Sequence, residues 1–98
     1  MKINAAVLRK TGAEISVEEL ELESPREAEV LVELKASGIC HSDYHVVTGD
    51  AAHELPVVLG HEGAGIIKEI GEGVSTLKPG DHVALSWIPF CGSCYFCL

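Results

Sequence analysis

The sequence predicts a mainly β domain, arranged as a small antiparallel barrel or sandwich. Apolar and polar residues alternate along several short segments, as they do in half-buried strands, and glycine and proline stand between these segments. Only the region after Cys40 favours a short helix. The 98 residues, 47% of them hydrophobic, are enough for one compact, soluble domain with its own core.

The strands are predicted from the alternation of apolar and polar residues and from the glycine and proline residues that interrupt it. Strands are expected at residues 2–7 and 14–18, with Gly12 in the turn between them. The clearest strand runs from residue 29 to residue 36, and four of its residues should share one face: Val30, Val32, Leu34 and Ala36. Further strands are expected at residues 57–59, 64–70 and 82–86.

Two local signals define a helix and a turn. The helix is expected to have Ser42 or Asp43 as its cap, to run through Val47 and to end at Gly49. The sequence Lys-Pro-Gly-Asp at residues 78–81 predicts a type II turn, because proline sets φ at its second position and glycine tolerates positive φ at its third.

Composition excludes several classes of function. Fifteen acidic residues against seven basic ones give a net charge of −8, which leaves no basic surface for nucleic acid or an anionic membrane. The least charged stretch, from Val83 to Leu98, is broken by Pro89 and Gly92 and does not predict a spanning helix. Because the amino terminus lacks the apolar centre of a signal peptide, we expect a cytoplasmic protein.

Three cysteines crowd the last eight residues of the chain. The spacing of Cys91, Cys94 and Cys97 lets neighbouring sulfurs converge on one ion. A cytoplasmic chain keeps its thiols reduced, so this pattern predicts a metal site rather than a disulfide framework. Structural zinc and an iron–sulfur cluster both fit the spacing, and each needs a further ligand.

Two other segments carry candidate ligands. Cys40 is followed by His41, and His61 and Glu62 stand between glycines. Taken singly, a buried cysteine or a hydrogen-bonded core histidine is the commoner explanation. Together, Cys40 and His61 supply two donors that zinc accepts, and the carboxylates of Asp43 and Glu62 can orient an imidazole. An open zinc site needs three protein ligands, and these residues alone indicate two.

The combined motifs resemble the amino-terminal part of the catalytic domain of zinc-dependent medium-chain alcohol dehydrogenases. The resemblance rests on GICHSD at residues 38–43, GHEGAG at 60–65, KPGDHV at 78–83 and the three clustered cysteines. It implies that residues 1–98 form part of a GroES-like, partly open β-barrel that is incomplete here. A nucleotide-binding domain, a third catalytic ligand and a fourth structural cysteine would then lie beyond Leu98.

The resemblance also implies two zinc sites. Cys40 and His61 would be ligands of a catalytic zinc, with Glu62 close to the metal and Asp43 supporting the site. A structural zinc would be held by Cys91, Cys94 and Cys97.

The implied activity is hydride transfer between an alcohol or aldehyde and NAD(P). Ser42 would contact the alcohol oxygen and start a proton relay that ends at His45. His41 would lie near the cofactor pyrophosphate, as a weaker anchor than the arginine that many relatives have there. NAD(P) is expected only with the nucleotide-binding domain, so the 98 residues alone are expected to be inactive. Any homo-oligomer would form through the parent protein.

Two other classes of function stay open. A self-standing metal module, with an iron–sulfur cluster or structural zinc, would serve in electron transfer or partner recognition and would have Cys40 and His61 as core residues. A GroES-like scaffold, such as a co-chaperonin-like ring subunit, would have no use for the clustered thiols.

Overall fold

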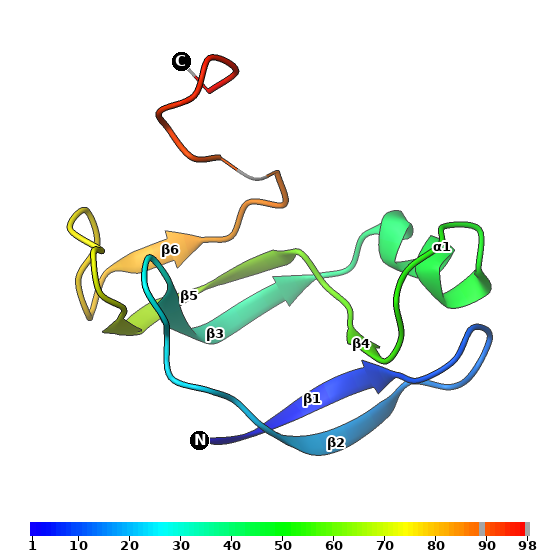
Figure 1. The fold of residues 1–98 in the computed structure, drawn as a ribbon. Helices are drawn as coiled ribbons and strands as arrows, with labels where there is room; N and C mark the ends of the chain where they lie inside the picture. Colours follow the sequence, from blue (N-terminus) through cyan, green and yellow to red (C-terminus); the bar gives the residue numbers. More distant parts are fainter. Residues whose placement is uncertain (89, 98) are drawn as a thin grey trace.

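The computed structural model describes residues 1–88 and 90–97. Pro89 and Leu98, which belong to the weakly charged stretch that does not predict a spanning helix, lie outside the described residues. Within these residues the chain forms two three-stranded antiparallel sheets and one short helix, which confirms the mainly β prediction. Figure 1 shows one sheet above the other, with the helix at one end. None of the described helical residues form a segment long and apolar enough to cross a membrane.

The first sheet has the strand order β2-β1-β4. β1 (Lys2–Leu8) and β2 (Ser16–Glu21) form an antiparallel hairpin, and the short β4 (Val57–Val58) pairs with the end of β1. Exposed and half-buried residues alternate along β1 from Lys2 to Ala6, and the two residues that end the strand, Val7 and Leu8, are both buried.

The second sheet has the order β3-β5-β6. It consists of β3 (Val30–Gly38), β5 (Glu62–Ile70) and β6 (His82–Ala84). β5 begins two residues earlier than the sequence predicts, because its pairing with β3 continues until Glu62 lies opposite Gly38. β6 ends two residues earlier than predicted, and the chain then leads away from both sheets (Figure 1).

β3 does not keep one apolar face along its length. Its register against β5 shifts twice, the second time between Leu34 and Ala36, where Lys35 has no counterpart on β5. Such bulges rotate the side chains that follow relative to the sheet. The bulge separates Ala36 from the rest of the expected common face. Before it, Val30 and Val32 are half-buried, whereas Leu34 borders two open hollows and is 55% exposed.

The helix α1 (His41–Thr48) begins earlier than the sequence predicts. Its cap is Cys40, so the expectation of Ser42 or Asp43 at that position is wrong. Asp43 instead occupies the first turn, where its carboxylate accepts a hydrogen bond from the Cys40 backbone N–H and its charge suits the positive end of the helix. Gly49 ends the helix with φ of 88°, as predicted.

The turn before β6 has the predicted glycine geometry. Gly80 has φ of 95°, and the N–H of Asp81 donates a hydrogen bond of 3.1 Å to the carbonyl oxygen of Lys78. A left-handed residue at this place is tolerated because glycine has no Cβ.

The core between the sheets is small. Among the described residues, the buried apolar side chains are Val7, Leu8 and Ile67. Two hollows open along β3: one of about 400 Å³, lined by both sheets with Ile3 and Leu31 among its residues, and one of about 530 Å³, lined by β3 and by residues that follow β2 and β6. The strands of the described chain therefore do not close into a complete barrel.

We expect Val7→Ala to lower the free energy of unfolding by about 2 kcal/mol, because it removes buried methyl groups and leaves a cavity. Val17 lies on the neighbouring strand and is 77% exposed, so Val17→Ala is the matched control. The control should change the free energy by less than about 0.5 kcal/mol. Urea unfolding followed by circular dichroism measures both, and equal losses would contradict the burial pattern.

Candidate metal centre

Three donor atoms come together at one end of the β3–β5 pair. They are the Cys40 sulfur, a His61 ring nitrogen and a Glu62 carboxylate oxygen, all within 4.8 Å of one another. Cys40 lies between β3 and α1, whereas His61 stands directly before β5, whose first residue is Glu62. Because Gly38 pairs with Glu62, the two strand ends meet and bring these side chains to the same place.

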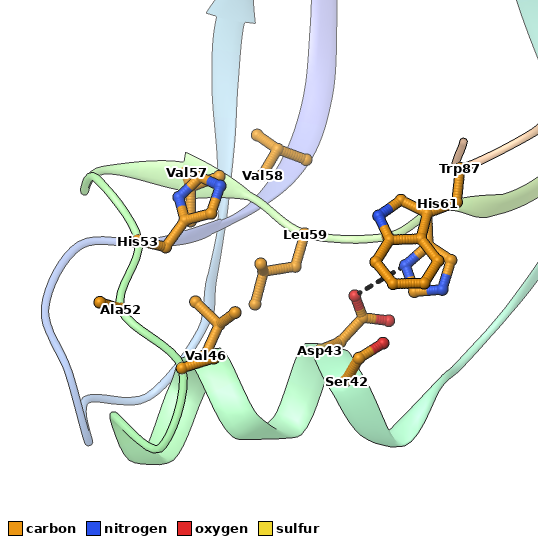
Figure 2. Close-up of a pocket in the computed structure, with 12 residues that line it drawn as sticks. Ser42, Asp43, Val46, Ala52, His53, Val57, Val58, Leu59, His61 and Trp87 are labelled. Carbon is orange, nitrogen blue, oxygen red and sulfur yellow. Dashed lines mark ion pairs between the residues drawn. The ribbon is translucent and has the colours of Figure 1, made fainter. Parts of the chain in front are cut away.

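The Asp43 carboxylate connects two of these residues. Its Oδ2 accepts the hydrogen bond from the Cys40 N–H at 3.3 Å, and its Oδ1 lies 3.4 Å from Nδ1 of His61 (Figure 2). The Asp43 and His61 side chains are only 18% and 19% exposed. On the other side of the ring, Nε2 lies 3.8 Å from Oε2 of Glu62. A carboxylate at one ring nitrogen fixes the orientation in which the other nitrogen can bind metal.

Ser42 lies beside the sulfur and also lines a pocket of about 330 Å³. Its hydroxyl donates a hydrogen bond of 3.1 Å to the Cys40 sulfur. In Figure 2 the polar groups of Ser42 and His61 are at one end of the pocket, apolar side chains such as Val46 and Leu59 line its middle, and His53 lies at the far end. Of the three candidate ligands, His61 lines this space, which is apolar enough for a hydrocarbon group.

Trp87 is a site residue that the sequence analysis missed. Its ring centroid lies 5.2 Å from that of His61, with the ring planes tilted by 33°, and the side chain forms part of the pocket wall (Figure 2). The available signal was that Trp87 is the chain's single tryptophan and stands shortly before the cysteine cluster.

His41 and His45 lie on α1, outside the cluster of candidate ligands. Their ring centroids are 4.7 Å apart, and Nδ1 of His45 lies 3.5 Å from the Asp50 carboxylate. No hydrogen bond joins Ser42 to His45 within the part of the chain that the structure describes. A proton that travels between these two residues therefore needs an intervening group.

The three clustered thiols form a second group of candidate ligands. Their sulfurs lie within 4.8 Å of one another, with 3.7 Å between Cys91 and Cys97 and 3.4 Å between Cys94 and Cys97. Backbone N–H groups of Ser93 and Cys94 donate hydrogen bonds to the Cys91 sulfur and lower its pKa from 9.0 to about 6.

Both groups of donors suit zinc. Two sulfurs on one tetrahedral zinc, each at about 2.3 Å, lie about 3.8 Å apart, which is close to the spacing of the clustered thiols. Zinc also accepts one thiolate, one imidazole and one carboxylate, the set that Cys40, His61 and Glu62 supply. The lowered pKa of Cys91 favours the thiolate, which is the form that binds metal.

Residues 26–98 match the model of the alcohol dehydrogenase GroES-like domain, and the chain belongs to this family. The fold class that the resemblance implied is thereby confirmed.

Individual relatives agree with this assignment. The NDMA-dependent alcohol dehydrogenase of Amycolatopsis methanolica is 53% identical over 97 residues, which are 99% of this chain and 26% of that protein. The crystal structure of benzyl alcohol dehydrogenase from Acinetobacter calcoaceticus has a TM-score of 0.92 and 44% identity over 99% of this chain and 26% of that one. A thermostable alcohol dehydrogenase from Pyrobaculum aerophilum, solved with cobalt and zinc bound, has a TM-score of 0.88 and 33% identity over 99% of this chain and 30% of that one. The chain spans about a quarter of the length of the curated relatives it matches.

In the metal-free chain, Cys91 should react with iodoacetamide at half its maximal rate near pH 6, because its pKa is lowered to about 6 and the thiolate is the reactive form. Peptide mass spectrometry of chains alkylated between pH 5 and pH 9 measures the midpoint. A midpoint at the ordinary thiol value of about 8.5 would contradict the hydrogen-bonded arrangement.

Asp43→Ala should weaken zinc binding at the Cys40–His61 pair by about 10- to 100-fold, because it removes the group that orients both ligands. Competition with a chelator of known affinity measures the change. Asp50→Ala is the control: Asp50 lies beyond the opposite end of α1 and contacts Thr48 and His45 instead. A similar loss in both variants would argue against a specific role for Asp43.

Proposed function

We propose that this chain is the metal- and substrate-binding part of an alcohol dehydrogenase, which transfers a hydride between an alcohol or aldehyde and NAD(P). The observation that carries the proposal is the convergence of Cys40, His61 and Glu62 within 4.8 Å beside an apolar pocket. A self-standing metal module based on the clustered thiols would have no need for this second group of donors. The alcohol dehydrogenase names of the relatives support the same function.

Zinc is the metal we assign to the Cys40, His61 and Glu62 donors. Cys40 and His61 with one further protein donor, either Glu62 or the third ligand that the family resemblance places beyond Leu98, leave a coordination position for a substrate oxygen, as in catalytic zinc sites. When bound, zinc supplies a Lewis acid that polarises this oxygen. The Pyrobaculum relative solved with cobalt and zinc supports the choice of metal. A second, structural zinc would bind the thiolates of Cys91, Cys94 and Cys97 and one further donor.

The pocket indicates a small alcohol or aldehyde as substrate. A volume of about 330 Å³ suits a small molecule, and the Trp87 ring and the Leu59 side chain suit its hydrocarbon part. Its oxygen would lie at the polar end, within reach of the Ser42 hydroxyl. The name of the relative from Acinetobacter, a benzyl alcohol dehydrogenase, is consistent with this class.

Ser42 and His45 are the residues we assign to proton movement. The Ser42 hydroxyl can accept a proton at Oγ while it donates its own, so it passes a proton on without a net charge entering the site. The His45 side chain is 46% exposed, so its imidazole can exchange a proton with solvent.

NAD(P) would be held mainly by a separate nucleotide-binding domain of the same protein, since the relatives are about four times as long as this chain. His41, exposed at the start of α1, would face the cofactor pyrophosphate. When bound, NAD(P) supplies the hydride acceptor. We place the protein in the cytoplasm, where thiols stay reduced and available to zinc. Self-association would involve the rest of the protein.

Ser42→Ala should lower kcat by about 10²- to 10⁴-fold, because it removes the hydroxyl that moves the proton. Steady-state kinetics of the complete natural protein measure kcat, and atomic absorption measures its zinc content, which should not change. Ser42→Thr keeps the hydroxyl and should retain most of the turnover. Loss of zinc in parallel with activity would contradict the assigned role.

A further inference from the structure

Gly38, the last residue of β3, lies against the side chain of Glu62. A Cβ atom placed on Gly38 would lie 2.6 Å from Oε1 and 3.2 Å from Cβ of Glu62. The first distance is shorter than any normal contact. The Glu62 side chain therefore occupies the space that a side chain at position 38 would need.

The backbone does not explain this glycine. Gly49 and Gly60 have φ of 88° and 121°, values that favour glycine at those positions. Gly38 is not among the residues with positive φ and belongs to a regular strand, where any residue can adopt the conformation. What an added side chain at position 38 would meet is the Glu62 side chain, at its Oε1 and Cβ atoms.

We propose that Gly38 is a positioning residue for Glu62. The missing side chain lets the Glu62 carboxylate lie over the end of β3, within 4.8 Å of the donor atoms of Cys40 and His61. This inference rests on the proposed function, because it concerns a ligand of the assigned zinc.

A side chain at position 38 would move the carboxylate without unfolding the sheet. The Glu62 side chain is 48% exposed, so it can rotate into solvent when its place is taken. Its rotation would leave Cys40 and His61 where they are and remove one donor from the group. Zinc would then be held by fewer ligands and released faster.

The test is the rate of zinc release from the complete natural protein into excess 4-(2-pyridylazo)resorcinol. The release phase that Cys40→Ser abolishes is assigned to this site. Gly38→Ala should accelerate that phase about tenfold or more, the size of effect expected when a group that supports a metal site is displaced. Circular dichroism checks that the variant is folded.

The double variant distinguishes positioning from general damage. Glu62→Ala removes the clashing carboxylate, so adding Gly38→Ala in that background should change the release rate by less than about twofold. The same background keeps the test valid if Gly38→Ala alone fails to fold, because the 2.6 Å contact with Oε1 is gone and only the 3.2 Å contact with the Cβ atom of residue 62 remains.

Gly63→Ala is the matched control on the partner strand. Gly63 is next to Glu62, and its added Cβ would meet the side-chain ends of Leu85 and Leu34 at 2.8 and 3.0 Å instead of the carboxylate. This control should leave the release rate unchanged.

Three results would overturn the inference. They are an unchanged release phase in Gly38→Ala, an equal acceleration by Gly63→Ala, and an equal acceleration by Gly38→Ala with and without Glu62. In each case zinc still leaves through a phase that depends on Cys40, so the proposed function stands. If Cys40→Ser abolishes no phase, zinc is not held here and both proposals are wrong.

Discussion

The pairing of β3 with β5 is the constraint on which the rest of the site depends. The ladder ends with Gly38 opposite Glu62, and beyond this pair the two chain segments carry Cys40 and His61. A slip of one residue would turn every side chain of β5 to the opposite face of the sheet and take Glu62 away from Cys40. The geometry of the donors is therefore set by a strand register, which is stiffer than a loop.

Asp43 both stabilises the start of α1 and contacts a candidate ligand of the site. Asp43 bonds to the N–H of Cys40 at the start of the helix, a place where a carboxylate is stabilising. The same carboxylate contacts the ring of His61, which arrives from a distant part of the sequence. The charge that helps to begin the helix thus also orients a candidate ligand.

The parts of the fold that the sequence predicts are those decided by neighbouring residues. Alternation identified β1, and the glycine signals at Gly49 and Gly80 are borne out by their positive φ. The bulge at Lys35 depends on which residues of β5 lie opposite, which no local pattern contains.

The same limit applies to the site. Spacing alone favoured a metal at the clustered thiols, because those residues are close in sequence. Cys40 and His61 are separated by a helix and a strand, so their donor types and the family resemblance suggested a shared metal, but no spacing rule could show that they meet. Trp87 lies still further along the chain, after β6, and no spacing rule connects it to His61.

The two sheets contribute differently to the site. The donors are attached to β3, α1 and β5, whereas Val57 and Val58 of the pocket wall belong to β4, in the sheet that contains β1. Among the residues that the structure describes, Val7, Leu8 and Ile67 are the buried apolar ones, so little packing would oppose a small shear of one sheet against the other. Such a shear would widen or narrow the pocket while the donor atoms of Cys40, His61 and Glu62 keep their spacing. The width of that pocket would then depend on the stiffness of the junction between the sheets, whereas the spacing of the donor atoms depends on the β3–β5 register.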